Sequence, residues 1–445
     1  MALTPMLRNI WDSIANRGLE LLGKRVDATT LTSLCRELLS ERGEASGTAL
    51  ARNVAEHYQR LNVSERETFF LTLLGKEYLP DPKNVLEAAE RYRANPNSDT
   101  LAALFELSES LRQELFRRIN LAPGGTAAVV GMREDLLKVL PSHPELEPVN
   151  ADMRHLLSSW FNRGFLRLER IDWRTPAVVL EKLIEHEAVH QIHGWDDLRH
   201  RLTGDRRCFA FFHPALPDEP LIFVEVALTR GSVRSVQALL DRSRAQLDPR
   251  QADTAIFYSI NNCLDGLRGI SFGSFLIKQV VAELEAEHLR LDTFITLSPI
   301  PGFRKWCQNL TADQKNELLV DGDAEALASV RETGWQDHAL TRDLARPVLM
   351  RLCAHYLLHE RRNDRALDPV AAFHLKNGAS IDRIHWLADT SRKGIEQSFG
   401  LMVNYEYLSW QIERNHEGYV KRGKIAASPK VTALLQKPRN HVREA

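Results

Sequence analysis

The stretch TAIFYSINNCLDGLRGISFGSFLIKQVVAELEAEH (254–288), followed by LDTFITLS (291–298), decides the predicted fold. Its first part, TAIFYSIN (254–261), is rich in β-branched and aromatic residues and therefore predicts a strand. A glycine-bearing loop (263–273) follows, then an amphipathic helix (275–288) and a second strand. A strand, a loop, a helix and a strand in this order are typical of a βαβ-type unit, so we predict an α/β domain around it.

Further elements of this domain are predicted on the N-terminal side of the unit. RCFAFF (207–212) and LIFVEVALT (221–229) have strand composition, and the loop HPALPDEP separates them. A helix is expected to start at Thr175-Pro176 and to run through HEAVHQI (186–192). A charged helix is predicted over residues 231–246.

On the C-terminal side, residues 311–365 are predicted to be helical, and ASIDRIHWLA (379–388) predicts a late strand. Residues 421–445 carry seven Lys or Arg and one Glu. We expect this last segment to form a surface tail.

The first 155 residues have a different character, because β-branched runs are scarce and apolar residues recur at helical spacing. Most of the helices predicted here need neighbours to bury an apolar stripe, which predicts a helical bundle. PSHPELEPVN (141–150) contains three prolines and predicts a break between helices. We place the domain boundary soon after it, with the bundle at 1–155 and the second domain at 156–445.

The composition of the 445 residues, 44% hydrophobic and 26% charged, is that of a folded protein. With 58 Lys and Arg against 59 Asp and Glu, overall charge does not indicate a nucleic-acid partner. No apolar run reaches the length of about 18 residues that indicates a membrane span, and no signal peptide is evident. Five scattered cysteines favour a reducing compartment, so we expect a cytoplasmic protein.

The segment HEAVH (186–190) matches the HExxH zinc motif, in which two histidines one helical turn apart bind the metal and Glu acts as a base. A zinc hydrolase that uses His186, Glu187 and His190 is therefore an alternative function. However, no third ligand follows at a suitable spacing, and sixteen histidines make a chance match plausible. We favour the interpretation that the motif is accidental and lies on a half-exposed helix.

The loop between the first strand and the helix of the βαβ unit is a candidate ligand site. Gly266, Gly269 and Gly273 permit close approach of a ligand, and the start of the next helix offers free N–H groups to a phosphate. A plain tight turn between strand and helix is supported about equally well.

Three other residue types could take part in proton transfer. Ser298 precedes the stiff turn PIPG (299–302), although a serine before proline often only closes a turn. His374 can exchange a proton near neutral pH, but a lone histidine is more often packed or solvent-facing. Tyr405 and Tyr407 are, on residue type alone, ordinary aromatics.

Several blocks of the chain together resemble malonyl-CoA decarboxylase. They occur in the order of that family over residues 200–410 and read RRCFAFFHPALPDEPLIFVEVALT, FYSINNCLDGLRGISFGSFLIKQVV, FITLSPIPGFRKW, LDPVAAFHLKNGA and IHWLADTSRKGIEQSFGLMVNYEYL. The resemblance implies an α+β protein with an N-terminal helical bundle that makes oligomer contacts, in a homodimer or homotetramer. It also implies an acetyltransferase-like (GNAT) α/β catalytic domain, which holds acyl-CoA where two central strands splay.

The activity that the resemblance implies is conversion of malonyl-CoA to acetyl-CoA and CO2, which regulates malonyl-CoA in fatty-acid metabolism. No metal or organic cofactor is expected, because the thioester accepts the electrons. The family's catalytic residues correspond to Ser298, His374 and Tyr407. Besides Ser298 and His374, its substrate contacts correspond to Arg268, Gly269, Ile270, Ser271, Phe272, Gly273 and Ser274.

Some relatives have Glu at the position of Ser271, so any role of that carboxylate is either filled by another group here or not essential. Two alternatives to the decarboxylase remain besides the zinc hydrolase. One is an acyl-CoA-dependent N-acyltransferase on the same fold, and the other is a CoA-binding scaffold without activity.

Overall fold

A computed structural model describes four stretches of the chain, namely residues 27–41, 43–270, 276–287 and 290–436. The chain divides into two compact units, which we describe separately. The first contains the residues up to Leu166 and two later segments, 213–219 and 264–272, and the second contains the rest. No helix in the described stretches is long and apolar enough to cross a membrane.

The first unit is helical. Its described α-helices are α2 (Ala28–Ser40), α3 (Glu44–Arg60), α4 (Val63–Thr72), α5 (Pro82–Ala94), α6 (Ser98–Ser108), α7 (Leu111–Asn120), α8 (Gly125–Val139) and α9 (Glu147–Trp160). Local chemistry starts several of them, as where Asn62 and Glu65 cap α4 reciprocally. Apolar side chains such as Leu31, Phe69 and Phe116 are fully buried between the helices, which accounts for the helical spacing in the sequence.

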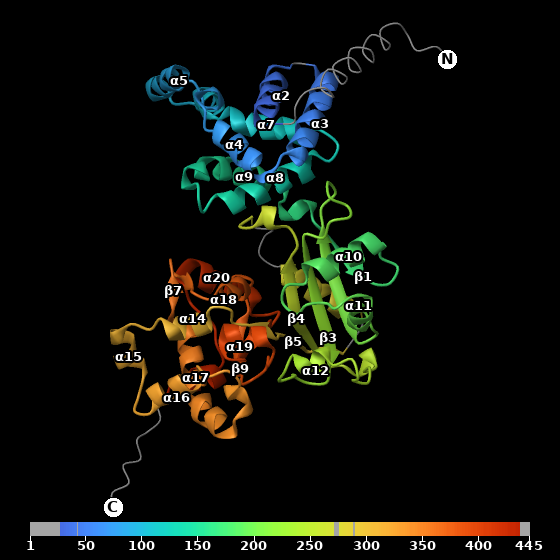
Figure 1. The fold of residues 1–445 in the computed structure, drawn as a ribbon, viewed down its shortest axis with the longest axis vertical. Helices are drawn as coiled ribbons and strands as arrows, with labels where there is room; N and C mark the ends of the chain where they lie inside the picture. Colours follow the sequence, from blue (N-terminus) through green and yellow to red (C-terminus); the bar gives the residue numbers. More distant parts are fainter. Residues whose placement is uncertain (1–26, 42, 271–275, 288–289, 437–445) are drawn as a thin grey trace, which may run out of the picture. The chain divides into compact units, whose positions relative to one another are not determined.

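The second unit is built on a mixed sheet in the order β1–β2–β3–β4–β5–β10–β6, with β9 paired to β10. Figure 1 labels the central strands β3, β4 and β5 of this sheet. The strands are β1 (Arg167–Ile171), β2 (Arg206–Phe212), β3 (Ile222–Thr229), β4 (Thr254–Asn262), β5 (Thr293–Thr296), β6 (Ser298–Pro299), β9 (Ser380–His385) and β10 (Met402–Glu406). All residues of β2 and β3 are buried, which explains their continuous hydrophobic runs. The predicted α+β class, a helical unit followed by an α/β unit, is thereby confirmed.

The helices of the second unit and a small hairpin complete the fold. The helices are α10 (Ala177–His186), α11 (Trp195–Arg201), α12 (Gln237–Leu240), α13 (Leu276–Ala286), α14 (Phe303–Gln308), α15 (Ala312–Leu318), α16 (Asp323–Ser329), α17 (Ala339–His359), α18 (Pro369–Lys376), α19 (Arg392–Ser398), α20 (Ile412–Arg422) and α21 (Pro429–Thr432). The hairpin consists of β7 (Arg361–Arg362) and β8 (Arg365–Ala366).

The two central strands β4 and β5 are parallel, as the predicted βαβ unit requires, and α13 connects them. Their register runs only from Thr254 opposite Thr293 to Phe257 opposite Thr296. Beyond that point β4 continues to Asn262, whereas β5 ends at Thr296 and the next strand, β6, pairs with β10. The central strands therefore diverge after Phe257, and β4, which stays paired with β3, is left to line a cavity along its other edge.

Three predictions about the second unit were wrong. Residues 231–246 form only the short helix α12, because the Asp241 carboxylate accepts hydrogen bonds from the Ser243 backbone and hydroxyl and turns the chain. Residues 361–366 form a hairpin, because Asn363 and Asp364 adopt the left-handed conformation, with φ of 51° and 61°.

The third wrong prediction concerns the surface tail. Residues 421–436 are folded, since they include α21 and since the Ile381 amide donates to the Ala426 carbonyl at 2.9 Å. Val431 is fully buried. Residues 437–445 lie outside the described part of the chain.

Arg133 on α8 ties later residues of the first unit to its helices. The guanidinium donates to the carbonyls of Gly266 at 2.6 Å and Arg268 at 2.9 Å, and to the Asn150 side chain at 3.1 Å. Burial lowers the pKa of Arg133 to about 10, so the side chain remains cationic at neutral pH. One buried cation thus satisfies three acceptors.

We predict that Arg133→Ala lowers the free energy of unfolding by about 3 kcal/mol, because three acceptors lose their donor. Lys138→Ala on the same helix removes an exposed cation and should change stability by no more than about 0.5 kcal/mol. Urea denaturation followed by circular dichroism measures both. Equal, small effects of the two substitutions would show that Arg133 does not have this structural role.

Candidate active site

Three residues that are distant in the sequence meet in the second unit. Ser298 lies on β6, His374 on α18, and Tyr407 directly after β10. The imidazole Nδ1 of His374 lies 2.7 Å from the Tyr407 hydroxyl, and its Nε2 lies 3.2 Å from the Ser298 Oγ. The structure thus brings together the three residues that the family resemblance marks as catalytic.

The position of His374 follows from how α18 begins and what it packs against. Asp368 caps the helix, its Oδ1 accepting from the amides of Val370 at 3.0 Å and Ala371 at 2.9 Å. Pro369 occupies the first turn. The imidazole stacks on the ring of Tyr405, with centroids 4.5 Å apart. The DP dipeptide therefore sets the start of the helix, and the aromatic ring fixes the imidazole plane.

Burial determines the protonation of this group of residues. It lowers the pKa of His374 to about 3, so the imidazole is neutral at physiological pH. Burial also raises the pKa of Tyr407 far above its ordinary value, so the phenol keeps its proton. That phenol has no other hydrogen-bond partner among the described residues, so it donates to Nδ1. The imidazole proton then resides on Nε2 and points to Ser298.

The row of hydrogen bonds ends at Thr296. The Ser298 hydroxyl donates to the Thr296 Oγ1 at 2.8 Å, and the same oxygen accepts from the Tyr405 amide at 3.0 Å. The row Tyr407–His374–Ser298–Thr296 thus has one direction of donation. We call it the hydroxyl–imidazole row.

A cavity of about 230 Å³ opens beside Ser298 and His374. Its remaining lining is mostly apolar and comes from Val189, Ile222, Phe257, Tyr258, Ser259, Ile260, Asn262, Pro299, Pro369, Val370 and Phe373. The stretch of β4 that diverges from β5 supplies one wall. An apolar lining screens charge less than water does, which strengthens any electrostatic interaction made inside the cavity.

The expectation that HEAVH lies on a helix was wrong. Helix α10 ends at His186, and Glu187 has an extended backbone with ψ of 95°. The cause is the Glu187 carboxylate itself, whose Oε1 accepts from the amides of Val189 at 2.8 Å and His190 at 2.7 Å. His186 and His190 therefore share no helix face. Within the described stretches, no three His, Cys, Asp or Glu side chains are grouped so that they could hold a metal.

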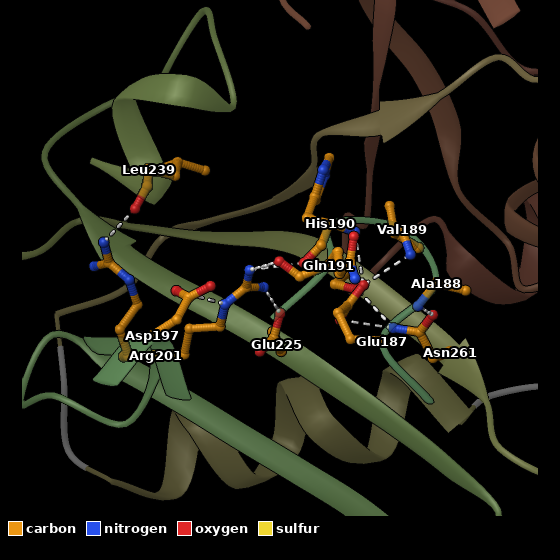
Figure 2. A network of polar contacts seen from close by, with 12 residues as sticks. Glu187, Ala188, Val189, His190, Gln191, Asp197, Arg201, Glu225, Leu239 and Asn261 are labelled. Atoms are coloured by element: carbon orange, nitrogen blue, oxygen red, sulfur yellow. Dashed lines mark hydrogen bonds and ion pairs between the residues drawn. The ribbon is translucent and has the colours of Figure 1, made fainter. Parts of the chain in front are cut away.

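Glu187 instead anchors residues 187–191, which we call the strap, to β4 (Figure 2). Its Oε2 accepts from the Ser259 hydroxyl at 2.7 Å and the Asn261 amide at 2.8 Å, and Asn261 in turn accepts from the Ala188 amide. The strap places Val189 on the wall of the cavity. Glu187, a residue of the HEAVH segment, thus shapes the wall of the cavity through the strap.

A buried ion pair holds the other end of the strap (Figure 2). The Arg201 guanidinium donates to the His190 carbonyl at 2.7 Å and to the Glu225 carboxylate on β3 at 2.9 Å. Burial lowers the pKa of His190 to about 4, so this imidazole is also neutral. The strap is therefore attached to two strands of the sheet.

The other predicted substrate contacts either belong to the first unit or lie outside the described residues. Arg268, Gly269 and Ile270 belong to the first unit, where Gly269 adopts a φ of 80° that favours glycine. Ser271, Phe272, Gly273 and Ser274 lie outside the described residues. The role of this loop in substrate binding therefore stays a prediction.

Thr296 was missed by the sequence reasoning. It stands two residues before Ser298 on the same stretch of strand, and alternate residues of a strand face the same side. This spacing was the available signal. The strand alone does not show that the two hydroxyls are 2.8 Å apart.

Comparison with known proteins identifies the family. The family model for the malonyl-CoA decarboxylase C-terminal domain matches residues 164–445, and the model for the N-terminal domain matches residues 78–161. The chain belongs to the malonyl-CoA decarboxylase family. The predicted family and the prediction of an enzyme are thereby confirmed. The matches meet between residues 161 and 164, whereas the predicted boundary at 155 stays a prediction.

Individual relatives agree with this assignment. The mitochondrial malonyl-CoA decarboxylase of the goose Anser anser anser is 35% identical in an alignment 412 positions long, which covers 85% of this chain and 82% of that protein. The mouse mitochondrial enzyme is 38% identical over 358 residues, covering 74% of this chain and 71% of its own.

Solved structures of malonyl-CoA decarboxylases are also similar. The protein from Rhodopseudomonas palustris has a TM-score of 0.87 and 48% identity, covering 92% of this chain and 99% of its own. The protein from Agrobacterium vitis has a TM-score of 0.87 and 47% identity, covering 92% of this chain and 100% of its own.

We predict that Glu187→Gln lowers the free energy of unfolding by about 2 kcal/mol, because an amide group then faces N–H and O–H donors. Glu185→Gln, at an exposed position of α10, is the matched control and should have almost no effect. Urea denaturation compares the two. Metal analysis of the wild type should find far less than one zinc per chain, and one bound zinc that is lost in His186→Ala would overturn this account of the motif.

Proposed function

We propose that this chain decarboxylates malonyl-CoA to acetyl-CoA and CO2, and that Ser298 and His374 supply the proton that replaces the lost carboxylate. The observation that carries the proposal is the hydroxyl–imidazole row at the wall of a small apolar cavity. Membership of the malonyl-CoA decarboxylase family supports the substrate and the reaction.

The reaction needs few groups. When the carbon–carbon bond to the carboxylate breaks, its electron pair moves toward the thioester carbonyl and an enolate forms as CO2 leaves. One well-placed donor to the developing oxyanion contributes about 3–4 kcal/mol in a site without water. Because the thioester accepts the electrons, we propose that no metal or organic cofactor is needed.

The enolate carbon then takes one proton. We propose that this proton comes from Nε2 of His374, either directly or through Ser298. In the second case the Ser298 hydroxyl gives its proton to carbon and takes the Nε2 proton. In both cases Nδ1 takes the proton of Tyr407, so the imidazole ends the step neutral. Water restores the phenol, so the net reaction consumes one proton. In the direct case, Ser298 binds the malonyl carboxylate.

The wider setting is also part of the proposal. Removal of malonyl-CoA would regulate its level in fatty-acid metabolism. Two bacterial relatives, at 47–48% identity, are more similar than the mitochondrial enzymes at 35–38%, and a third bacterial relative is 34% identical. The first two support a bacterial cytoplasmic location. The family resemblance supports a homodimer or homotetramer formed through the helical unit.

We predict that the purified protein releases CO2 and acetyl-CoA from malonyl-CoA in the presence of a chelator and without a second substrate. Ser298→Ala and His374→Ala should each lower kcat by about 100-fold or more, because each removes a member of the proton path. Coupled detection of acetyl-CoA measures the rate, and circular dichroism verifies folding. Turnover at the wild-type rate in either folded variant would contradict these roles, and a strict need for an acyl acceptor would favour the acyltransferase.

We further predict that Tyr407→Phe lowers kcat by about 100-fold with little change in KM, because the imidazole loses the donor that fixes its tautomer. Tyr405→Phe is the matched control. This tyrosine is equally buried and keeps its ring, and its hydroxyl has no hydrogen-bond partner among the described residues. Steady-state kinetics compare the two, and equal losses in both would indicate that packing matters and the Tyr407 hydroxyl does not.

A further inference from the structure

A second cavity in the same unit is strongly cationic. It measures about 840 Å³ and lies between the β7–β8 hairpin, α18 and the C-terminal end of α20. These three elements lie close together in the second unit (Figure 1). The cationic side chains of its lining are Arg361, Arg365, Lys376, Lys421 and Arg422, whereas Asp364 is the acidic one. The lining therefore has an excess of positive charge that suits an anion.

Two positive charges of the β7–β8 hairpin lie where they lower the stability of the paired strands. Arg362 and Arg365 lie directly opposite one another across the two strands. Like charges in this arrangement destabilise a pair of strands. The turn between them, Asn363 and Asp364, is left-handed at both positions, which few residue types tolerate. Of these two arginines, Arg365 lines the cavity and Arg362 does not, so the hairpin directs one of its opposed cations to the cavity.

Two of the arginines are available to a ligand. Within the described stretches, the guanidinium groups of Arg365 and Arg422 have no hydrogen-bond or ion-pair partner, and both residues are exposed. Arg361 differs, because its guanidinium donates to the Leu358 carbonyl at 2.6 Å. Lys421 pairs with Glu417 at 3.1 Å. The cavity thus contains two cations that other residues hold in place, Arg361 and Lys421, and two arginines whose side chains can turn toward a bound group.

Tyr419 adds a neutral donor at the buried end of the cavity. Its hydroxyl accepts the Ala366 amide at 2.9 Å, which leaves its own proton to donate. The ring is 5% exposed, and the charges of Arg361 and Arg365 act on the hydroxyl. Guanidinium groups beside a hydroxyl donor form the kind of site that recognises phosphate oxygens.

The cationic cavity adjoins the cavity of the hydroxyl–imidazole row. Pro369 and Phe373 on α18 line both. The first cavity, at about 230 Å³, is smaller than the roughly 300–1,000 Å³ of pockets that enclose drug-sized ligands. If malonyl-CoA is the substrate, only its acyl end and part of the adjoining chain fit there. The phosphorylated nucleotide must lie outside it.

From these observations we propose that the cationic cavity binds phosphate groups of the nucleotide part of the acyl-CoA substrate, with Arg365 and Arg422 as binding residues. This inference rests on the proposed function. It adds phosphate contacts on residues other than those of the loop at 268–274, which stays a predicted contact for the rest of the substrate. Because the contacts are made equally in the ground state and the transition state, they lower KM and leave kcat unchanged.

The test compares two substrates that share the acyl end. We expect Arg365→Gln and Arg422→Gln each to raise KM for malonyl-CoA by about tenfold with kcat unchanged. Malonyl-pantetheine has no nucleotide, so its KM should be the same in the variants and in the wild type. Arg362→Gln is the matched control, because it removes the same charge from the same hairpin but does not line the cavity.

Unchanged KM for malonyl-CoA, or an equal rise for both substrates, would overturn the proposal, as would an equal rise in Arg362→Gln. Isothermal calorimetry with adenosine 3′,5′-bisphosphate separates this result from a failure of the proposed function. Binding that Arg365→Gln and Arg422→Gln weaken by about tenfold supports the nucleotide site even if malonyl-CoA is not turned over. Inorganic phosphate that binds as tightly as the bisphosphate, or no binding of either, contradicts it.

Discussion

Burial of His374 between a phenol and a serine hydroxyl is the constraint on which the candidate site depends. Because the imidazole is out of water, it is neutral, and its hydrogen bonds to Tyr407 and Ser298 have a fixed direction. Three parts of the fold meet to produce this arrangement, namely the capped helix α18, the short strand β6 and the end of β10. The divergence of β4 from β5 then gives a substrate access to the row.

Among the described residues, no Asp, Glu, Lys or Arg side chain lines the cavity beside His374. Glu187 and Arg201 are buried, and the hydrogen bonds of their side chains hold the strap against β3 and β4. The cavity wall itself is mostly apolar, with neutral side chains at Ser298 and His374. The cations gather in the neighbouring cavity around Arg365. This separation suits a substrate whose reacting end must lose water while its other end carries phosphate charge.

Sequence reasoning predicted the parts of the fold that depend on local pattern. The β4–α13–β5 unit and the buried strands β2 and β3 follow from residue type and spacing. The combination of Ser298, His374 and Tyr407 came from the family resemblance, because each alone is an ordinary residue. The break in HEAVH was not predictable, since the Glu187 carboxylate competes with the helix only when β4 supplies its other partners. Asn363-Asp364 is a typical turn sequence, but the helical pattern of the residues before it led to the prediction of a helix there.

The protonation of His374 tests the central claim most directly. Two-dimensional NMR of protein labelled with ¹⁵N-histidine, with His374→Gln used to assign the signal, reports the state of both ring nitrogens. We predict a neutral ring with its proton on Nε2 throughout the range from pH 5 to pH 8, because burial lowers the pKa of His374 to about 3. An imidazolium signal that appears near pH 6.5, or a proton on Nδ1, would contradict the account.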